Sequence, residues 1–133
     1  MNAPLILAGC LAVIGAAVHG VGGEVLVVRN LSPANLPASR LGSPRMTKAM
    51  IHVTWHITTI AFLTVGVALL LSGSVLDGDA ARGISFVAAT AATGFAAVAV
   101  GLGVAAQPLR ALVRHPGPAV LTATAALAWL GAL

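Results

Sequence analysis

Ionisable side chains occur inside apolar stretches of this 133-residue chain at four positions, which are His19, Glu24, His52 and His56. A charged carboxylate in hydrocarbon is costly, so a carboxyl group there is paired, protonated or bound to an ion. Imidazole and carboxylate are also ligands for transition metals such as zinc, iron, copper and nickel. We therefore expect the four residues to form one site and treat all four as candidate metal or cofactor ligands.

The spacing of these residues predicts how they face one another. His52 and His56 are four residues apart, so on a helix they share one face and both imidazoles can reach one ion. His19 and Glu24 are five residues apart, which is about 140° of rotation on a regular helix. The glycines among residues 20–23 permit local unwinding or a π-bulge that would change this angle. The pattern H-G-x-G-G-E facing H-x-x-x-H is the most specific signal in the chain.

Four roles fit this set of residues. Two or three imidazoles and the carboxylate could ligate a transition metal, or His19 together with His52 or His56 could hold a haem axially. The same groups could relay protons or bind an ion in a small transporter. In the fourth role they only hydrogen-bond across helices, as in a non-catalytic accessory or assembly subunit of a larger membrane complex. We expect metal or haem binding by a carrier, sensor or redox subunit, and the cofactor itself stays open.

Apolar helices must position these residues. Apolar residues make up 59% of the chain and charged residues 8%, with a mean hydropathy of +1.02, whereas about a quarter of an ordinary soluble domain is charged. A soluble globular protein is therefore excluded. Crossing the hydrocarbon core takes roughly 20 apolar residues, and the predicted spans are about 5–28, 49–72, 84–106 and 113–133. We expect an all-α, four-helix transmembrane bundle in which residues 1–133 form a single integral membrane domain.

Charge predicts the orientation of these spans. The first and third connections carry an excess of basic residues, whereas the second balances one arginine against two aspartates. By the positive-inside rule the first and third connections are cytoplasmic and both termini lie outside. Counted from the basic edges of the first two spans, Glu24 and His52 lie about 6 to 8 Å deep. His19 and His56 lie about 12 to 15 Å deep, so the antiparallel spans bring the four residues to matched depths.

Other features are interpreted as structural. Trp55 is expected to anchor at the membrane interface, and most threonines of the second span are expected to bond back to their own helix. Small residues recur every four positions in the third span and are expected to pack inside the bundle. This small-residue stripe comprises Thr93, Ala97, Gly101 and Ala105. The sequence contains no G-x-S-x-G, P-loop or C-x-x-C motif, so an enzymatic site would need a partner chain to complete it.

The expected partners follow from the same composition. They are the lipid bilayer, together with further membrane subunits or a second copy of the chain. Nucleic acid is not expected, because the net charge of +4 is explained by short loops that orient the protein in the bilayer. The basic residues of those loops are Arg29, Arg40, Arg45, Lys48, Arg110 and Arg114.

One segment resembles a group of known proteins. Residues 44–59, with T-W-H-x-T-T at positions 54–59, and the earlier His19, Gly20 and Glu24 resemble a segment of small bacterial four-helix integral membrane proteins that have no assigned function. The resemblance covers about the first half of the chain. It implies a bacterial inner (cytoplasmic) membrane protein and implies no activity.

Overall fold

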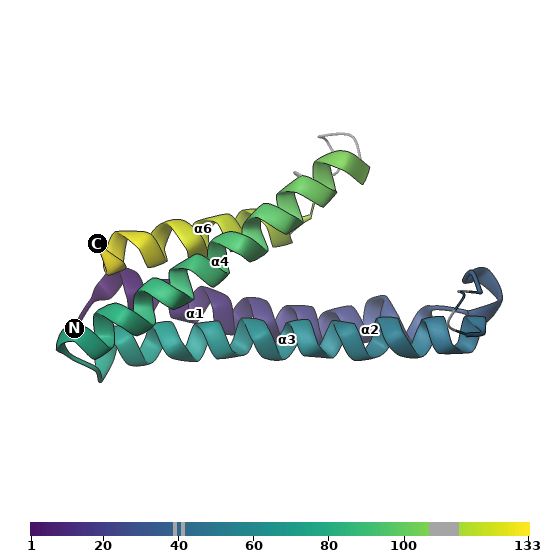
Figure 1. The fold of residues 1–133 in the computed structure, drawn as a ribbon, viewed down its shortest axis with the longest axis horizontal. Coiled ribbons are helices and arrows are strands. Elements are labelled where there is room, and N and C mark those ends of the chain that lie inside the picture. Colours follow the sequence, from purple (N-terminus) through teal and green to yellow (C-terminus); the bar gives the residue numbers. More distant parts are fainter. Residues whose placement is uncertain (39, 41, 107–114) are drawn as a thin grey trace.

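The computed structural model describes residues 1–38, 40, 42–106 and 115–133, and every regular element in these ranges is a helix (Figure 1). The long helices are α1 (Ala3–Ala17), α3 (Pro44–Ser74), α4 (Gly78–Ala106) and α6 (Pro116–Ala132). Short elements follow α1, and they are the π-helix η1 (Val18–Gly22), the helical turn α2 (Gly23–Leu26) and the 3₁₀ turns η2 (Val28–Asn30) and η3 (Pro33–Asn35). The all-α prediction is confirmed for this part of the chain.

Three continuous helical stretches are long and apolar enough to cross a membrane. They are Ala3–Asn30, Pro44–Ser74 and Gly78–Ala105, in agreement with the first three predicted spans. Helix α6 has 17 residues, slightly fewer than the roughly 20 that a full crossing takes. The start of the fourth predicted span, at residues 113 and 114, and Arg110 of the third connection lie outside the described residues.

Local sequence explains where the helices begin. Asn2 precedes α1, and its side-chain oxygen accepts a hydrogen bond from the backbone N–H of Leu5 at 3.2 Å. Pro44 and Pro116 open α3 and α6, where a missing N–H costs no helical hydrogen bond. Gly78 makes the tight turn between α3 and α4 with a φ of 60°, a conformation that favours glycine.

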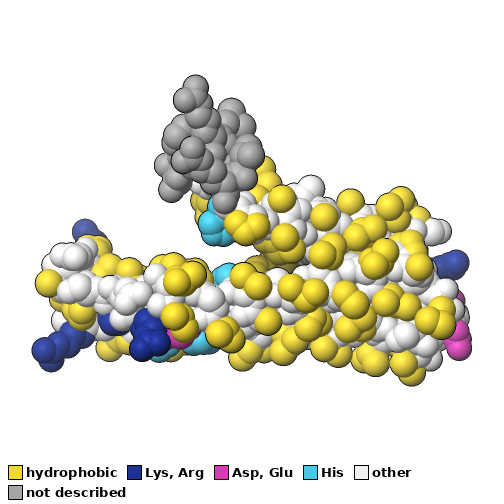
Figure 2. Space-filling view, turned by 180° about the vertical axis from the view of Figure 1, so that it is seen from behind, with side chains coloured by type: hydrophobic (Ala, Val, Ile, Leu, Met, Phe, Trp, Pro, Cys, Tyr) yellow, Lys and Arg dark blue, Asp and Glu magenta, His cyan; other side chains and the backbone are white. Residues whose placement is uncertain are grey.

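The helices form two antiparallel pairs, α1 with α3 and α4 with α6 (Figure 1). The pairs pack against each other at the end that carries both chain termini. Toward the other end α4 diverges from α3, whereas α6 follows α1 as far as Val120, which lies beside Gly15. Figure 2 shows the resulting opening from behind. The four predicted helices are present, and their packing as one closed bundle is not confirmed.

Small side chains form the core at the end where the pairs meet. Its buried residues are Leu5, Ala8, Leu69, Ala88, Ala89 and Ala128. Asn2 ties three helices together there: its backbone N–H donates to the Gly73 carbonyl and its side-chain amide donates to the Gly131 carbonyl, both at 2.8 Å. A Cβ on Gly131 would lie 2.6 Å from Leu5 Cγ, so glycine permits this close approach.

The small-residue stripe of α4 is exposed, contrary to the prediction that it packs inside the bundle. Thr93, Ala97, Gly101 and Ala105 are all exposed, and a Cβ on Gly101 would meet no described atom within 4 Å. Among the described residues, Thr93 alone of the four makes a hydrogen bond to a neighbouring helix, which its hydroxyl accepts from the Trp129 indole N–H of α6 at 2.9 Å. The buried face instead carries Ala88, Ala89, Ala92 and Ala96. Because alanine occurs on several faces of α4, its spacing alone could not identify the packed face.

Candidate metal centre

A π-helix lies between the two candidate residues of the first span. Glycines at residues 20–23 were predicted to permit it, and the structure has η1 at Val18–Gly22. Each π-type hydrogen bond spans five residues instead of four, so the turn holds more residues than an α-turn. The angle between His19 and Glu24 therefore differs from that on a regular helix, and the two side chains meet different residues of α3.

Gly20 and Gly23 make room for side chains of α3. A Cβ on Gly20 would lie 2.6 Å from Thr59 Cγ2, and one on Gly23 would overlap the indole of Trp55. The space beside these glycines is thus filled by Thr59 and Trp55. A porphyrin cannot occupy the same space, so this geometry does not fit the haem role considered for His19.

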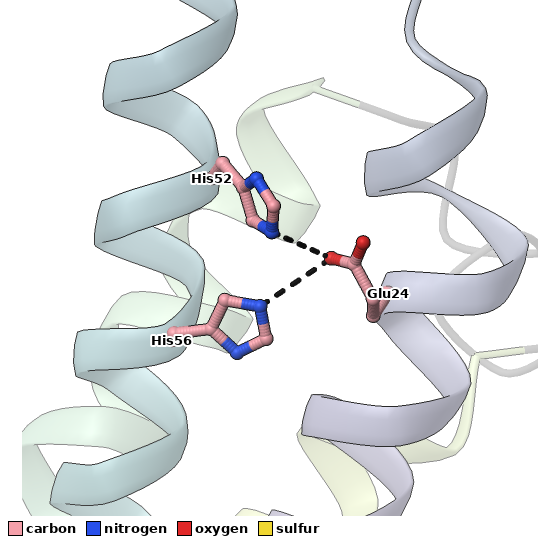
Figure 3. A group of neighbouring side chains, drawn as sticks. All are labelled: Glu24, His52 and His56. Carbon is pink, nitrogen blue, oxygen red and sulfur yellow. Dashed lines mark ion pairs between the residues drawn. The ribbon is translucent and has the colours of Figure 1, made fainter.

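Glu24 faces His52 and His56 across the α2–α3 interface (Figure 3). Its Oε2 atom lies 3.1 Å from His52 Nε2 and 3.4 Å from His56 Nε2. The two imidazoles come from successive turns of α3, with ring centroids 5.0 Å apart. The i, i+4 spacing therefore brings both rings to one carboxylate, as predicted from the sequence.

The carboxylate oxygen between the imidazoles lacks a hydrogen bond. Glu24 Oε2 is buried from solvent and makes no hydrogen bond to any described residue, although both Nε2 atoms lie within ion-pair distance of it. A buried polar atom without a partner is costly, and a bound cation would compensate it. The three side chains offer ligand atoms that all lie within 4.8 Å of one another.

The separations suit a small divalent metal ion. Two ligand atoms that each lie about 2.1 Å from a tetrahedral metal are about 3.4 Å apart. The measured Glu24 to His52 and Glu24 to His56 distances of 3.1 and 3.4 Å are close to that value. Two histidines and one carboxylate form a known ligand set for zinc and for non-haem iron(II), and such sites keep coordination positions open.

Exposure shows where further ligands would enter. The side chains of His52 and His56 are 47% and 44% exposed, whereas that of Glu24 is 27% exposed. The imidazoles therefore lie at the outer surface of the α1–α3 pair. A ligand from the surrounding medium or a residue of another subunit can reach an ion held there.

His19 is not part of this group. Its Nδ1 lies 2.9 Å from Thr59 Oγ1, and its ring stacks on Trp55 with centroids 4.4 Å apart and an interplanar angle of 10°. Trp55 in turn donates its indole N–H to the His19 carbonyl at 2.9 Å. Of the four candidates, the structure brings three together and places His19 in a separate aromatic cluster.

Trp55 and Thr59 have contacts that the sequence did not predict. Trp55, which was expected to anchor at the interface, is half-buried and inserts against Gly23. Thr59 does bond back to its own helix, with its hydroxyl donating to the Trp55 carbonyl at 3.0 Å, and it also meets His19. The small residues opposite them, Gly20 and Gly23, were the available signal, because glycine on one helix indicates a large side chain on its neighbour.

Comparison with known proteins returns no match to any family model, to any curated protein or to any solved structure.

Proposed function

We propose that this protein binds a transition-metal ion through Glu24, His52 and His56. The observation that carries the proposal is the buried Glu24 Oε2, which lies between two imidazole nitrogens at 3.1 and 3.4 Å and has no hydrogen bond among the described residues. One carboxylate oxygen and two imidazole nitrogens that lie this close together can all coordinate one cation, whereas they form no hydrogen bond with one another. Zinc or iron(II) is the ion best suited to this set.

The protein that holds this ion is proposed to be a four-span protein of a bacterial inner membrane, with both termini outside. The hydropathy of three of its helical stretches supports insertion in a bilayer. Arg29 and Lys48 flank the paired first and second spans, which supports a cytoplasmic first connection. The metal site then lies in the cytoplasmic half of the bilayer, close to the pool from which an ion would be delivered.

Open coordination positions favour exchange over permanent structural binding. Structural zinc sites are closed by four protein ligands, whereas this cluster supplies three. A carrier, a sensor or a redox subunit needs such access. A partner membrane subunit or a second copy of the chain would complete the ligand set from the exposed side of His52 and His56.

The test is metal titration of the purified protein. Metal-stripped protein in detergent is titrated with Zn²⁺, and with Co²⁺ as a spectroscopic probe, against the variants His52→Ala and His56→Ala. We expect one ion per chain in the unaltered protein and loss of binding in both variants. His115→Asn is the matched control, because it removes an exposed histidine at the start of α6 where asparagine also caps a helix.

A second candidate function is that of an accessory subunit in which these residues only hold α2 against α3. The same distances favour it, because 3.1 and 3.4 Å are also within ion-pair range when an imidazole is protonated. In that case the unaltered protein binds no stoichiometric metal, and His52→Ala lowers its stability or its association with a partner.

A further inference from the structure

A hollow of about 320 Å³ lies beside the His19 ring, apart from the candidate metal centre. Its walls are formed by His19, Met50, Ile51, Thr54, Trp55 and Thr58. None of the three proposed metal ligands lines it. Its volume falls at the lower end of the range of small-molecule pockets.

The hollow lies where the helix pairs separate. Thr54, Thr58, Phe62 and Leu69 follow one another at helical spacing and share one face of α3. At the closed end of the molecule this face is covered: Leu69 is fully buried, and Phe62 meets Phe95 of α4 edge-on at 4.9 Å. Toward the other end α4 diverges (Figure 1), which leaves the threonine end of the same face uncovered.

The hydrogen bonds around His19 favour one ring tautomer. The Thr59 hydroxyl donates to the Trp55 carbonyl at 3.0 Å. With its single proton in that bond, the hydroxyl accepts from His19 Nδ1, which lies 2.9 Å away. A neutral imidazole protonated at Nδ1 carries a lone pair on Nε2, and Nε2 has no hydrogen bond to any described residue. The His19 ring thus offers a hydrogen-bond acceptor.

A second polar group in the wall is also uncommitted. The Thr58 hydroxyl donates to the Thr54 carbonyl at 2.9 Å, but the Thr54 hydroxyl itself has no hydrogen bond within the described ranges. The rings of His19 and Trp55, which stack face to face, supply the aromatic part of the lining. The remaining walls, Met50 and Ile51, are apolar.

From this combination we infer that the hollow binds a lipid-soluble aromatic ring that carries a hydroxyl group, of the hydroquinone class. The ring lies beside the edge of the His19 imidazole, close to the plane of that ring, so that its O–H can donate to His19 Nε2. A second ring oxygen accepts from the Thr54 hydroxyl. Because the walls belong to helices apolar enough to span a membrane, the ligand arrives through the lipid. The inference does not depend on metal binding.

Binding in the hollow can be measured through the fluorescence of Trp55. The chain has two tryptophans, so Trp129→Phe leaves Trp55 as the sole emitter. Metal-stripped protein in phosphatidylcholine nanodiscs is titrated with a decyl-substituted hydroquinone and with its dimethyl ether, which has no O–H. We expect saturable quenching of Trp55 by both, with the ether half-saturating at an about three- to tenfold higher concentration, the loss expected for one hydrogen bond.

Two substitutions test the protein groups that are proposed to hydrogen-bond the ligand. His19→Asn keeps a donor at the position of Nδ1 for Thr59 but removes Nε2, and Thr54→Val removes the hydroxyl at nearly constant size. Each is expected to weaken hydroquinone binding by about three- to tenfold. Thr64→Val is the control, because the Thr64 hydroxyl bonds to its own helix at the Ile60 carbonyl and does not line the hollow.

The outcomes separate this inference from the metal proposal. His19→Asn should weaken hydroquinone binding and leave metal affinity unchanged, whereas Glu24→Gln should weaken metal binding and leave hydroquinone affinity unchanged. Quenching that rises without saturation, or that is unchanged in His19→Asn, overturns the inference. If His19→Asn loses its helical circular dichroism, the comparison of hydroquinone with its dimethyl ether in the unaltered protein tests the inference instead. Equal affinity for the two compounds contradicts an acceptor at Nε2.

Discussion

Glu24 is the only glutamate in the chain and joins the two imidazoles of the candidate centre. Glu24→Gln keeps the size of the side chain and removes its charge. We predict that the affinity for Zn²⁺ falls by more than about 100-fold, beyond the usual effect of altering a residue that only supports a ligand. Isothermal titration of metal-stripped protein measures it. Asp79→Asn in the first turn of α4 is the control, and equal affinity in both variants would remove Glu24 from the ligand set.

Gly23 is predicted to be intolerant of even one methyl group. In Gly23→Ala the new Cβ overlaps the Trp55 indole, and such overpacking costs about 1 to 3 kcal/mol. Gly22→Ala is the matched control, because its Cβ would meet only Val18 Cγ1 at 3.9 Å. Thermal unfolding in detergent should show a clear loss for Gly23→Ala and none for Gly22→Ala. Similar curves for the two variants would contradict the packing described for Trp55.

Residue spacing predicted which kinds of ligand the site contains, but it did not predict which of the four candidate residues belong to the site. The four-residue interval between His52 and His56 fixes a shared face in any helix, so this pair could be predicted. His19 could not be assigned, because its direction depends on the π-helix, which alters the angle to Glu24. Its partner Thr59 is one of several threonines on α3, and the sequence does not distinguish the one that faces His19.

Asn2 connects the start of α1 to the ends of α3 and α6. Asn2→Ala removes the cap on Leu5 N–H and the hydrogen bond to the Gly131 carbonyl. We predict a loss of about 1 to 2 kcal/mol in the free energy of unfolding, measured by denaturant unfolding in mixed micelles. Thr122→Ala on α6, which removes an exposed hydroxyl bonded to its own helix, should change it by less than about 0.5 kcal/mol.

Helix type and approximate position could be predicted, but helix packing could not. Hydropathy and length identify the three long apolar stretches, because a bilayer demands about 20 apolar residues of any helix that crosses it. Packing in lipid depends instead on small residues. Helix α4 offers them both at Ala88 and Ala92, which are buried, and at Ala97 and Gly101, which are exposed. The positions of α6 and α1 determine which of these faces of α4 is buried.

The basic residues of the connections predict the side of the membrane on which each connection lies. In a Cys10→Ala background, Ser32→Cys marks the first connection and Asp79→Cys the second. We predict that a membrane-impermeant maleimide labels Asp79→Cys in intact cells and Ser32→Cys only in inverted vesicles. The opposite pattern would place the candidate metal centre in the outer half of the bilayer.

The divergence of α4 also has a consequence for the surrounding lipid. All four helices lie together at the end that carries the termini, whereas α4 stands apart from α3 toward the other end (Figure 1), so in a bilayer the protein would fill the two leaflets differently. Acyl chains or a bound ring compound must fill the opening, because a void beside apolar helices loses its dispersion contacts. We expect a protein with such an opening on one side to fit best where the two monolayers differ in packing or the membrane is curved.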